Sequence, residues 1–286
     1  MVVSTVTLDA KPVDLRTAAA IEAAEARAWA DLYAAAPADW SAAAGLGAQE
    51  VGGAFVVRWA ATGRRYFSRT IGLGVFEPAN RAAMDEILDG FDQAGITMFL
   101  LQSLPHSRPA EYESWLREFG LEPFDAQDRV VRDGRPLAVA PTLAGDRELT
   151  VERVRHASVG EWVEFIERVY RLETGPWLPR LIGRPGWHQY VAREGGEIVA
   201  ARGMHIGADG TAWLGMDGPV PGVTTDDYEP DAALCAVIVS DGLVRGARTF
   251  IADIEAASDQ QATPAYQSFG RLGFTRPYLR THWTRR

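Results

Sequence analysis

The order of predicted helices and strands in this chain repeats once, and this repeat constrains the fold more than any single motif. When the strand predicted from Ile96 is laid on the strand predicted from Thr249, the segments that follow come into register without a gap. Leu116–Leu121 then aligns with Phe269–Phe274, and both segments end a short helix at a glycine. Few residues match, so the repeat is one of element order. It predicts two diverged copies of one fold.

Each half of the chain alternates helical and strand-like periodicity. In the first half, helices are predicted over 13–35, 80–94 and 111–119, and strands over 52–59, 65–75 and 96–101. In the second half, strands are predicted over 149–155, 189–194, 197–205, 211–216, 249–253 and 278–283, and helices over 159–170, 231–245 and 263–272. This alternation predicts an α/β fold, of the α+β mixed-sheet kind, in both halves.

The segment 136–148 is the best predicted domain boundary. It contains Pro136, Pro141, Gly145 and Asp146 and has no apolar periodicity. We therefore expect one domain over 1–135, a linker over 136–148 and a second domain over 149–286.

Composition excludes several classes of function. The formal net charge of −9 argues against a nucleic-acid partner, which needs clustered cations. No apolar run reaches the roughly 18 residues of a membrane span, so no membrane partner is expected. Cys235 is the only cysteine, and the five histidines show no metal-binding spacing, so no metal is expected and a reducing cytoplasm is the natural setting.

The end of the chain carries a family resemblance. Ala265–Phe274 reads as a short amphipathic helix closed by a glycine, and a strand follows as far as Trp283. This ending resembles the last block of the GNAT-type N-acetyltransferase superfamily. The resemblance covers 149–284 well and the first half more loosely. It implies two tandem GNAT-like domains with central twisted, splayed sheets flanked by helices, in which the splay admits the pantetheine arm of acetyl-CoA.

The resemblance also implies where acetyl-CoA or another acyl-CoA binds. The cofactor-binding positions are expected at the end of the central strand and in the loop after it: Gly215, Met216, Asp217, Gly218, Val220 and Gly222. The family's glycine-rich phosphate loop is replaced by the acidic run Thr225–Asp231. Two readings stay open: the acidic run is a surface insertion, or the coenzyme site is lost and the cleft takes a small cationic metabolite.

Two residues are candidate catalytic groups. The family's acid position is Phe269 here, but Tyr266 lies three residues earlier on the same helix face and is the candidate acid. Asp217 follows the central strand and is the candidate base for a substrate amine. A core tyrosine and a polar strand end are the structural alternatives.

The family places its acceptor loop after the first helix of the domain. Glu173, Trp177, Arg180 and Trp213 are therefore the expected substrate-binding residues, with a proline-rich connection and a core tryptophan as the alternative. Together these features predict an acyltransferase that moves an acyl group from acyl-CoA to the amine of a small molecule. A transferase that takes amino acids from charged tRNA is disfavoured by the acidic balance. The sequence does not indicate an oligomeric state.

Overall fold

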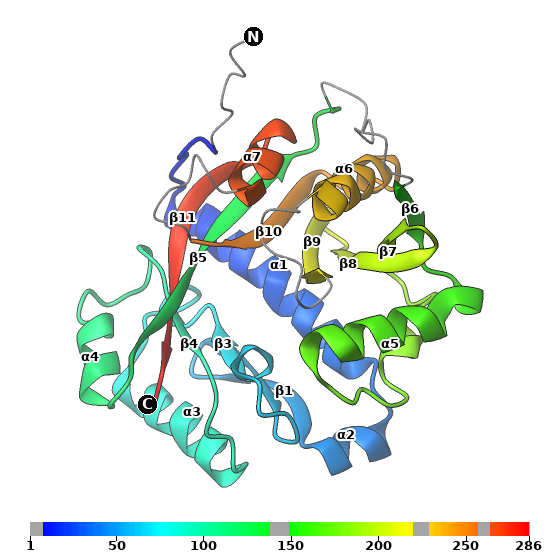
Figure 1. Cartoon of the computed structure of the whole chain (residues 1–286). Coiled ribbons are helices and arrows are strands. Elements are labelled where there is room, and N and C mark those ends of the chain that lie inside the picture. The colour runs from blue at the N-terminus through cyan, green and yellow to red at the C-terminus, as the bar shows by residue number, and fades with distance from the viewer. Residues whose placement is uncertain (1–7, 138–148, 220–228, 257–263, 286) are drawn as a thin grey trace. The chain divides into compact units, whose positions relative to one another are not determined.

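The computed structural model describes residues 8–137, 149–219, 229–256 and 264–285. The chain forms two compact units, which are described separately (Figure 1). The C-terminal unit consists of Met1–Lys11 and Arg129–Pro277, and the N-terminal unit of Pro12–Asp128 and Tyr278–Arg286.

The N-terminal unit begins with the 20-residue helix α1 (Leu15–Ala34), which Asp14 caps by accepting a hydrogen bond from the Thr17 N–H at 2.8 Å. The elements after α1 are α2 (Ala38–Ala44), β1 (Leu46–Val51), β2 (Ala54–Trp59), the 3-10 turn η1 (Arg65–Phe67), β3 (Arg69–Ile71), α3 (Arg81–Gln93), β4 (Leu101–Ser103), α4 (Tyr112–Glu118) and the start of β5 (Glu122–Asp133). The end of β11 (Thr275–Thr284) completes the unit.

Two strand predictions for this unit are wrong in extent. The strand predicted over 65–75 is confined to β3, because Gly72 and Gly74 adopt positive φ angles of 77° and 78° and end it. The strand predicted over 96–101 begins only at Leu101. The strands β1 and β5 were not predicted.

The C-terminal unit follows the predicted order of elements closely. Its elements are β6 (Leu149–Arg153), the 3-10 turn η2 (His156–Ser158), α5 (Val159–Tyr170), the 3-10 turn η3 (Leu178–Leu181), β7 (Trp187–Glu194), β8 (Glu197–Ile206), β9 (Thr211–Pro219), α6 (Glu229–Val244), β10 (Thr249–Glu255) and α7 (Pro264–Arg271). The helices α6 and α7 pack on one face of this mixed sheet, and α5 contacts β8 and β9 from the other (Figure 1).

The strands β5 and β11 each contribute residues to both units. The strand order is β11-β5-β10-β9-β8-β7-β6 in the C-terminal unit, whereas β11 lies between β4 and β5 in the N-terminal unit. The compact units therefore divide within β5 and β11, at 128/129 and 277/278, and most of the linker predicted over 136–148 lies outside the described residues. A division inside a strand is not marked in the sequence by a change of composition such as a proline- or glycine-rich linker.

The predicted splay is present in the C-terminal unit. The parallel strands β9 and β10 pair only from Thr211↔Thr249 to Trp213↔Ile251. Beyond that point β9 continues along β8 as far as Pro219, and β10 continues to Glu255. The two central strands therefore form a fork that opens after Trp213.

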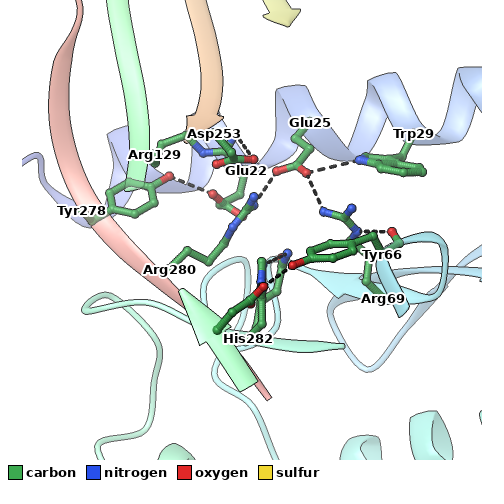
Figure 2. Close-up of polar contacts among 12 residues, drawn as sticks. Glu22, Glu25, Trp29, Tyr66, Arg69, Arg129, Asp253, Tyr278, Arg280 and His282 are labelled. Atoms are coloured by element: carbon green, nitrogen blue, oxygen red, sulfur yellow. Dashed lines mark hydrogen bonds and ion pairs between the residues drawn. The ribbon is translucent and has the colours of Figure 1, made fainter. Parts of the chain in front are cut away.

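The face of the N-terminal sheet that meets α1 is unusually polar. Glu22 and Glu25 of α1 are fully buried, and both carboxylates bond Arg280 of β11, which is also fully buried (Figure 2). Arg69 of β3 contacts Glu25 at 3.4 Å (Figure 2). Buried charges are tolerated only when they are paired, so these contacts fix α1 on the sheet in one position.

Candidate functional site

The fork carries a β-bulge on β9. Gly203 of β8 pairs with Gly215, and Ala201 pairs with Gly218, so Arg202 alone stands opposite Met216 and Asp217. Met216 has a φ angle of 54°, which is uncommon for a residue with a side chain and is often found at functional sites. A bulge interrupts the ladder, so the backbone of Met216 and Asp217 is released from regular pairing at the fork.

Gly215 is sterically required at this position. A Cβ built on Gly215 would lie 2.2 Å from two atoms of the Trp213 indole, because that ring lies across the glycine. Any side chain at 215 would displace the indole. The glycine therefore allows the indole to lie directly against the backbone beside the bulge.

A buried arginine joins the two segments that flank this fork. The Arg202 guanidinium, only 3% exposed, donates from Nη2 to Asp217 Oδ2 at 3.2 Å and to Asp231 Oδ1 at 2.9 Å. Its Nε donates to Asp231 Oδ1 at 3.1 Å. Asp217 lies at the end of β9 and Asp231 in the first turn of α6, so Arg202 ties these two elements together.

The two carboxylates differ in access to solvent. The Asp231 side chain is 12% exposed, whereas that of Asp217 is 48% exposed. Asp231 therefore directs its charge inward to Arg202 and is largely neutralised. Asp217 is held by the same arginine but presents its carboxylate at the surface.

The predicted cofactor-binding residues fall into two groups. Gly215, Met216 and Asp217 form the bulge, and Gly218 lies beyond it in β9, opposite Ala201. Val220 and Gly222, and most of the acidic run over 225–231, lie outside the described residues.

The predicted catalytic residues occupy different environments. Asp217 was predicted to follow the central strand, but it lies within β9, on the bulge. Tyr266 of α7 is fully buried in the apolar core beside α6, together with Phe269. The Arg202 guanidinium carbon lies 5.8 Å from the centre of the Phe269 ring, so α7 faces the same ion cluster.

The predicted acceptor residues are not all exposed. Trp177 is 1% exposed and Trp213 is 5% exposed, and the Trp213 ring lies 6.2 Å from that of Trp187. Glu173 and Arg180 are exposed on the segment after α5. The structural alternative, a core tryptophan, therefore describes the environment of Trp177, while Trp213 lines the bulge.

The sequence analysis missed two residues of this site. Arg202 is one, since an arginine in the apolar strand 197–206 gives no indication of its partners. Tyr170, the last residue of α5, is the other, and its hydroxyl donates to the backbone carbonyl of Asp217. The bulge is thus held from α5 on one side and from Arg202 on the other.

The Cys235 thiol belongs to the hydrophobic core of the C-terminal unit. Cys235 of α6 is fully buried, and burial raises the pKa of its thiol well above the ordinary value, so the reactive thiolate is disfavoured. Within the described ranges, no group of three or more His, Cys, Asp or Glu side chains is arranged to hold a metal ion. No helix in those same ranges is long and apolar enough to cross a membrane.

No protein-family model and no curated protein matches the chain. Solved structures do match it. A GCN5-related N-acetyltransferase from Kribbella flavida is 16% identical, with 93% of this chain and 94% of that chain covered at a TM-score of 0.62. A GCN5-related N-acetyltransferase from Sphaerobacter thermophilus is 16% identical, with 82% and 80% covered at a TM-score of 0.52. The chain has the GNAT fold.

A third similar structure is a tandem GNAT protein from the clavulanic acid biosynthesis pathway, at 12% identity and a TM-score of 0.52, with 82% of this chain and 78% of that chain covered. At these identities the likeness concerns the fold alone. It confirms the predicted tandem GNAT-like architecture, and the β9–β10 fork is the splayed pair that the GNAT resemblance predicted.

Proposed function

We propose that this protein is a GNAT-type acyltransferase that moves an acetyl or longer acyl group from acyl-CoA to the amine of a small molecule. One observation carries the proposal: β9 leaves β10 after Trp213 and immediately forms a bulge at Met216. A fork can position an extended thioester between the two strands, and backbone groups released from the ladder can donate hydrogen bonds to its carbonyl.

The residues at the fork fit the thioester end of acyl-CoA. The Trp213 indole occupies the space that a side chain at Gly215 would take, so this ring lies at the start of the fork. The bulge at Met216 and Asp217 holds the backbone that would border an extended arm. Acyl-CoA supplies an activated acyl carbonyl when it is bound. Backbone N–H groups of the bulge are the donors we assign to polarising that carbonyl, because donors fixed in advance stabilise a developing oxyanion.

Asp217 is the residue we assign to the acceptor amine. Its carboxylate is half exposed at the fork and is oriented by Arg202, so it can attract an ammonium group and accept a proton from it. Tyr266 stays the predicted general acid. We expect the reaction to take place in the cytoplasm, with a small molecule as the acceptor.

A transfer assay tests this proposal. Purified protein is incubated with acetyl-CoA and a panel of small amines, and both the released thiol and the acylated amine are measured. We expect thiol release that depends on the amine and is matched by an equal amount of acylated product. Thiol release without acylated product would show hydrolysis only and would contradict the proposal.

A second candidate is a GNAT-fold protein that binds or transforms a small cationic metabolite without acetyl-CoA. The first turn of α6 favours it, because Pro230 has no N–H to donate and Glu229 adds negative charge there, while Asp231 is already paired with Arg202. Mass spectrometry of small molecules that copurify with the protein distinguishes the two. A copurifying CoA derivative would exclude this second candidate, whereas a cationic metabolite without CoA would favour it.

A further inference from the structure

The N-terminal unit has a cavity of its own, which we call the α1 groove. It lies between α1, the β1–β2 hairpin and the segment that follows β3, and its volume is about 450 Å³. Pockets of this size hold small organic molecules. All of its lining residues belong to the N-terminal unit.

Small side chains on α1 create the groove. Ala23, Ala26 and Ala30 line it, and they lie on one face of the helix because they are three, four or seven residues apart. On the other side Phe55 of β2 and Phe76 line it, and both are half-buried. The groove therefore has an apolar floor with two aromatic side chains in its walls.

The walls of the groove are held in place. The Phe76 ring lies against Gly72, where a Cβ would come within 2.2 Å of the ring atom Cε2. On the face of α1 toward the sheet, Tyr278 of β11 donates to Glu22 at 2.8 Å and Arg69 of β3 lies 3.4 Å from Glu25 (Figure 2). Because these polar contacts fix α1 on the sheet, the helix is not free to move inward and close the groove.

The charged residues that line the α1 groove indicate which kind of ligand it can bind. Three charged residues line it, Arg27, Glu50 and Glu77, and all three side chains are exposed. The Glu77 side chain lies against the hairpin at Gly53, where a Cβ would be 3.1 Å from its Oε2. Two carboxylates and one guanidinium leave a net charge of −1 beside two aromatic rings. Carboxylates and aromatic rings both attract organic cations.

We propose that the α1 groove binds a small organic cation, namely an ammonium group with an apolar body. The site is separate from the β9–β10 fork and does not depend on the proposed acyl transfer. The N-terminal unit therefore has a binding role of its own, in addition to supplying strands to the fold.

Calorimetric titration of the full chain with choline, in the absence of any acyl donor, tests the proposal. The neutral isostere 3,3-dimethylbutan-1-ol is the matched ligand control. We expect saturable choline binding and at least tenfold weaker binding of the neutral alcohol, because only the charge differs.

Three variants locate the binding. Glu50→Gln/Glu77→Gln removes both carboxylates and is expected to weaken choline binding about tenfold. Ala30→Leu fills the groove from a half-exposed helix position and is expected to abolish binding. Glu86→Gln, an exposed carboxylate on α3 outside the groove, is the control and is expected to leave binding within twofold.

The titration results either support or overturn cation binding in the α1 groove. Loss of binding in the double variant and in Ala30→Leu, with unchanged thermal unfolding midpoints, supports the proposal. No saturable binding of choline by the wild-type chain would overturn it, as would equal affinity for choline and the alcohol. Equal weakening in Glu86→Gln would also overturn it, since binding would then follow the general acidity of the surface.

Discussion

Replacement of Arg202 by Met tests the ion cluster that flanks the fork. Methionine keeps most of the length and apolar area of the side chain but removes the guanidinium. Asp231, 12% exposed, then stays buried without its partner, whereas Asp217 can turn to solvent. Breaking a buried pair in this way costs about 3–5 kcal/mol. Because Asp231 retains some solvent access, we expect Arg202→Met to lower the free energy of unfolding by about 3 kcal/mol, the lower limit of this range.

A double-mutant cycle separates the lost charge pair from lost packing. Asp231→Asn removes the unpaired charge, so Arg202→Met/Asp231→Asn is expected to recover about 2 kcal/mol of the loss. The assay is urea unfolding followed by circular dichroism. The control is Arg193→Met, whose ion pairs with Glu152 and Glu161 reach solvent and are expected to contribute less than about 1 kcal/mol.

The cycle has two results that would refute this reasoning. One is an Arg202→Met variant as stable as the wild type, which would mean that Asp231 reaches solvent when its partner is removed. The other is a double variant no more stable than Arg202→Met, which would mean that packing accounts for the loss and the charge pair does not.

Two further predictions concern a proton donor and pH. Tyr266→Phe is expected to lower kcat for acyl transfer at least 100-fold with an unchanged KM, because it removes the predicted acid; an unchanged kcat would exclude that role. Burial, with Arg245 and Arg153 nearby, lowers the pKa of His188 from about 6.5 to about 4. The unfolded chain therefore binds more protons than the folded chain between pH 4 and 6.5, so stability falls as pH falls through this window. His188→Gln is expected to reduce this loss of unfolding free energy by about 1 kcal/mol, after allowance for partial solvent screening. Urea unfolding at a series of pH values measures the difference. An identical pH dependence in the variant would contradict the assignment.

The sequence predicts the C-terminal unit well because its elements have clear periodicity. The helix predicted over 159–170 has the observed bounds, and the strand and helix around the fork are found within a few residues of their predicted limits. The strand β5 was missed, because Glu122–Asp133 is mostly polar and contains a proline. Since β5 is an inner strand between β10 and β11, a division of the compact units within β5 could not be expected from the sequence.

The candidate site was predicted only in part. The expected positions of the cofactor-binding residues and of Asp217 followed from a family resemblance, whereas the bulge at Met216 was not predicted. Arg202 could not be predicted because its partner Asp231 lies in another element, and only the folded sheet brings the two within 2.9 Å. The polar face under α1 was missed for the same reason, since Glu22 and Glu25 look like exposed residues of an alanine-rich helix.

Calorimetric titration with acetyl-CoA and longer acyl-CoAs tests most directly whether the β9–β10 fork is an acyl-CoA cleft. The wild-type chain and Gly160→Ala, which places a methyl group in open space, are expected to bind one equivalent. Gly215→Ala is expected to lose binding, because its methyl group displaces the Trp213 indole at the fork. No heat at millimolar ligand with the wild type, or undiminished binding by Gly215→Ala, would contradict the assignment.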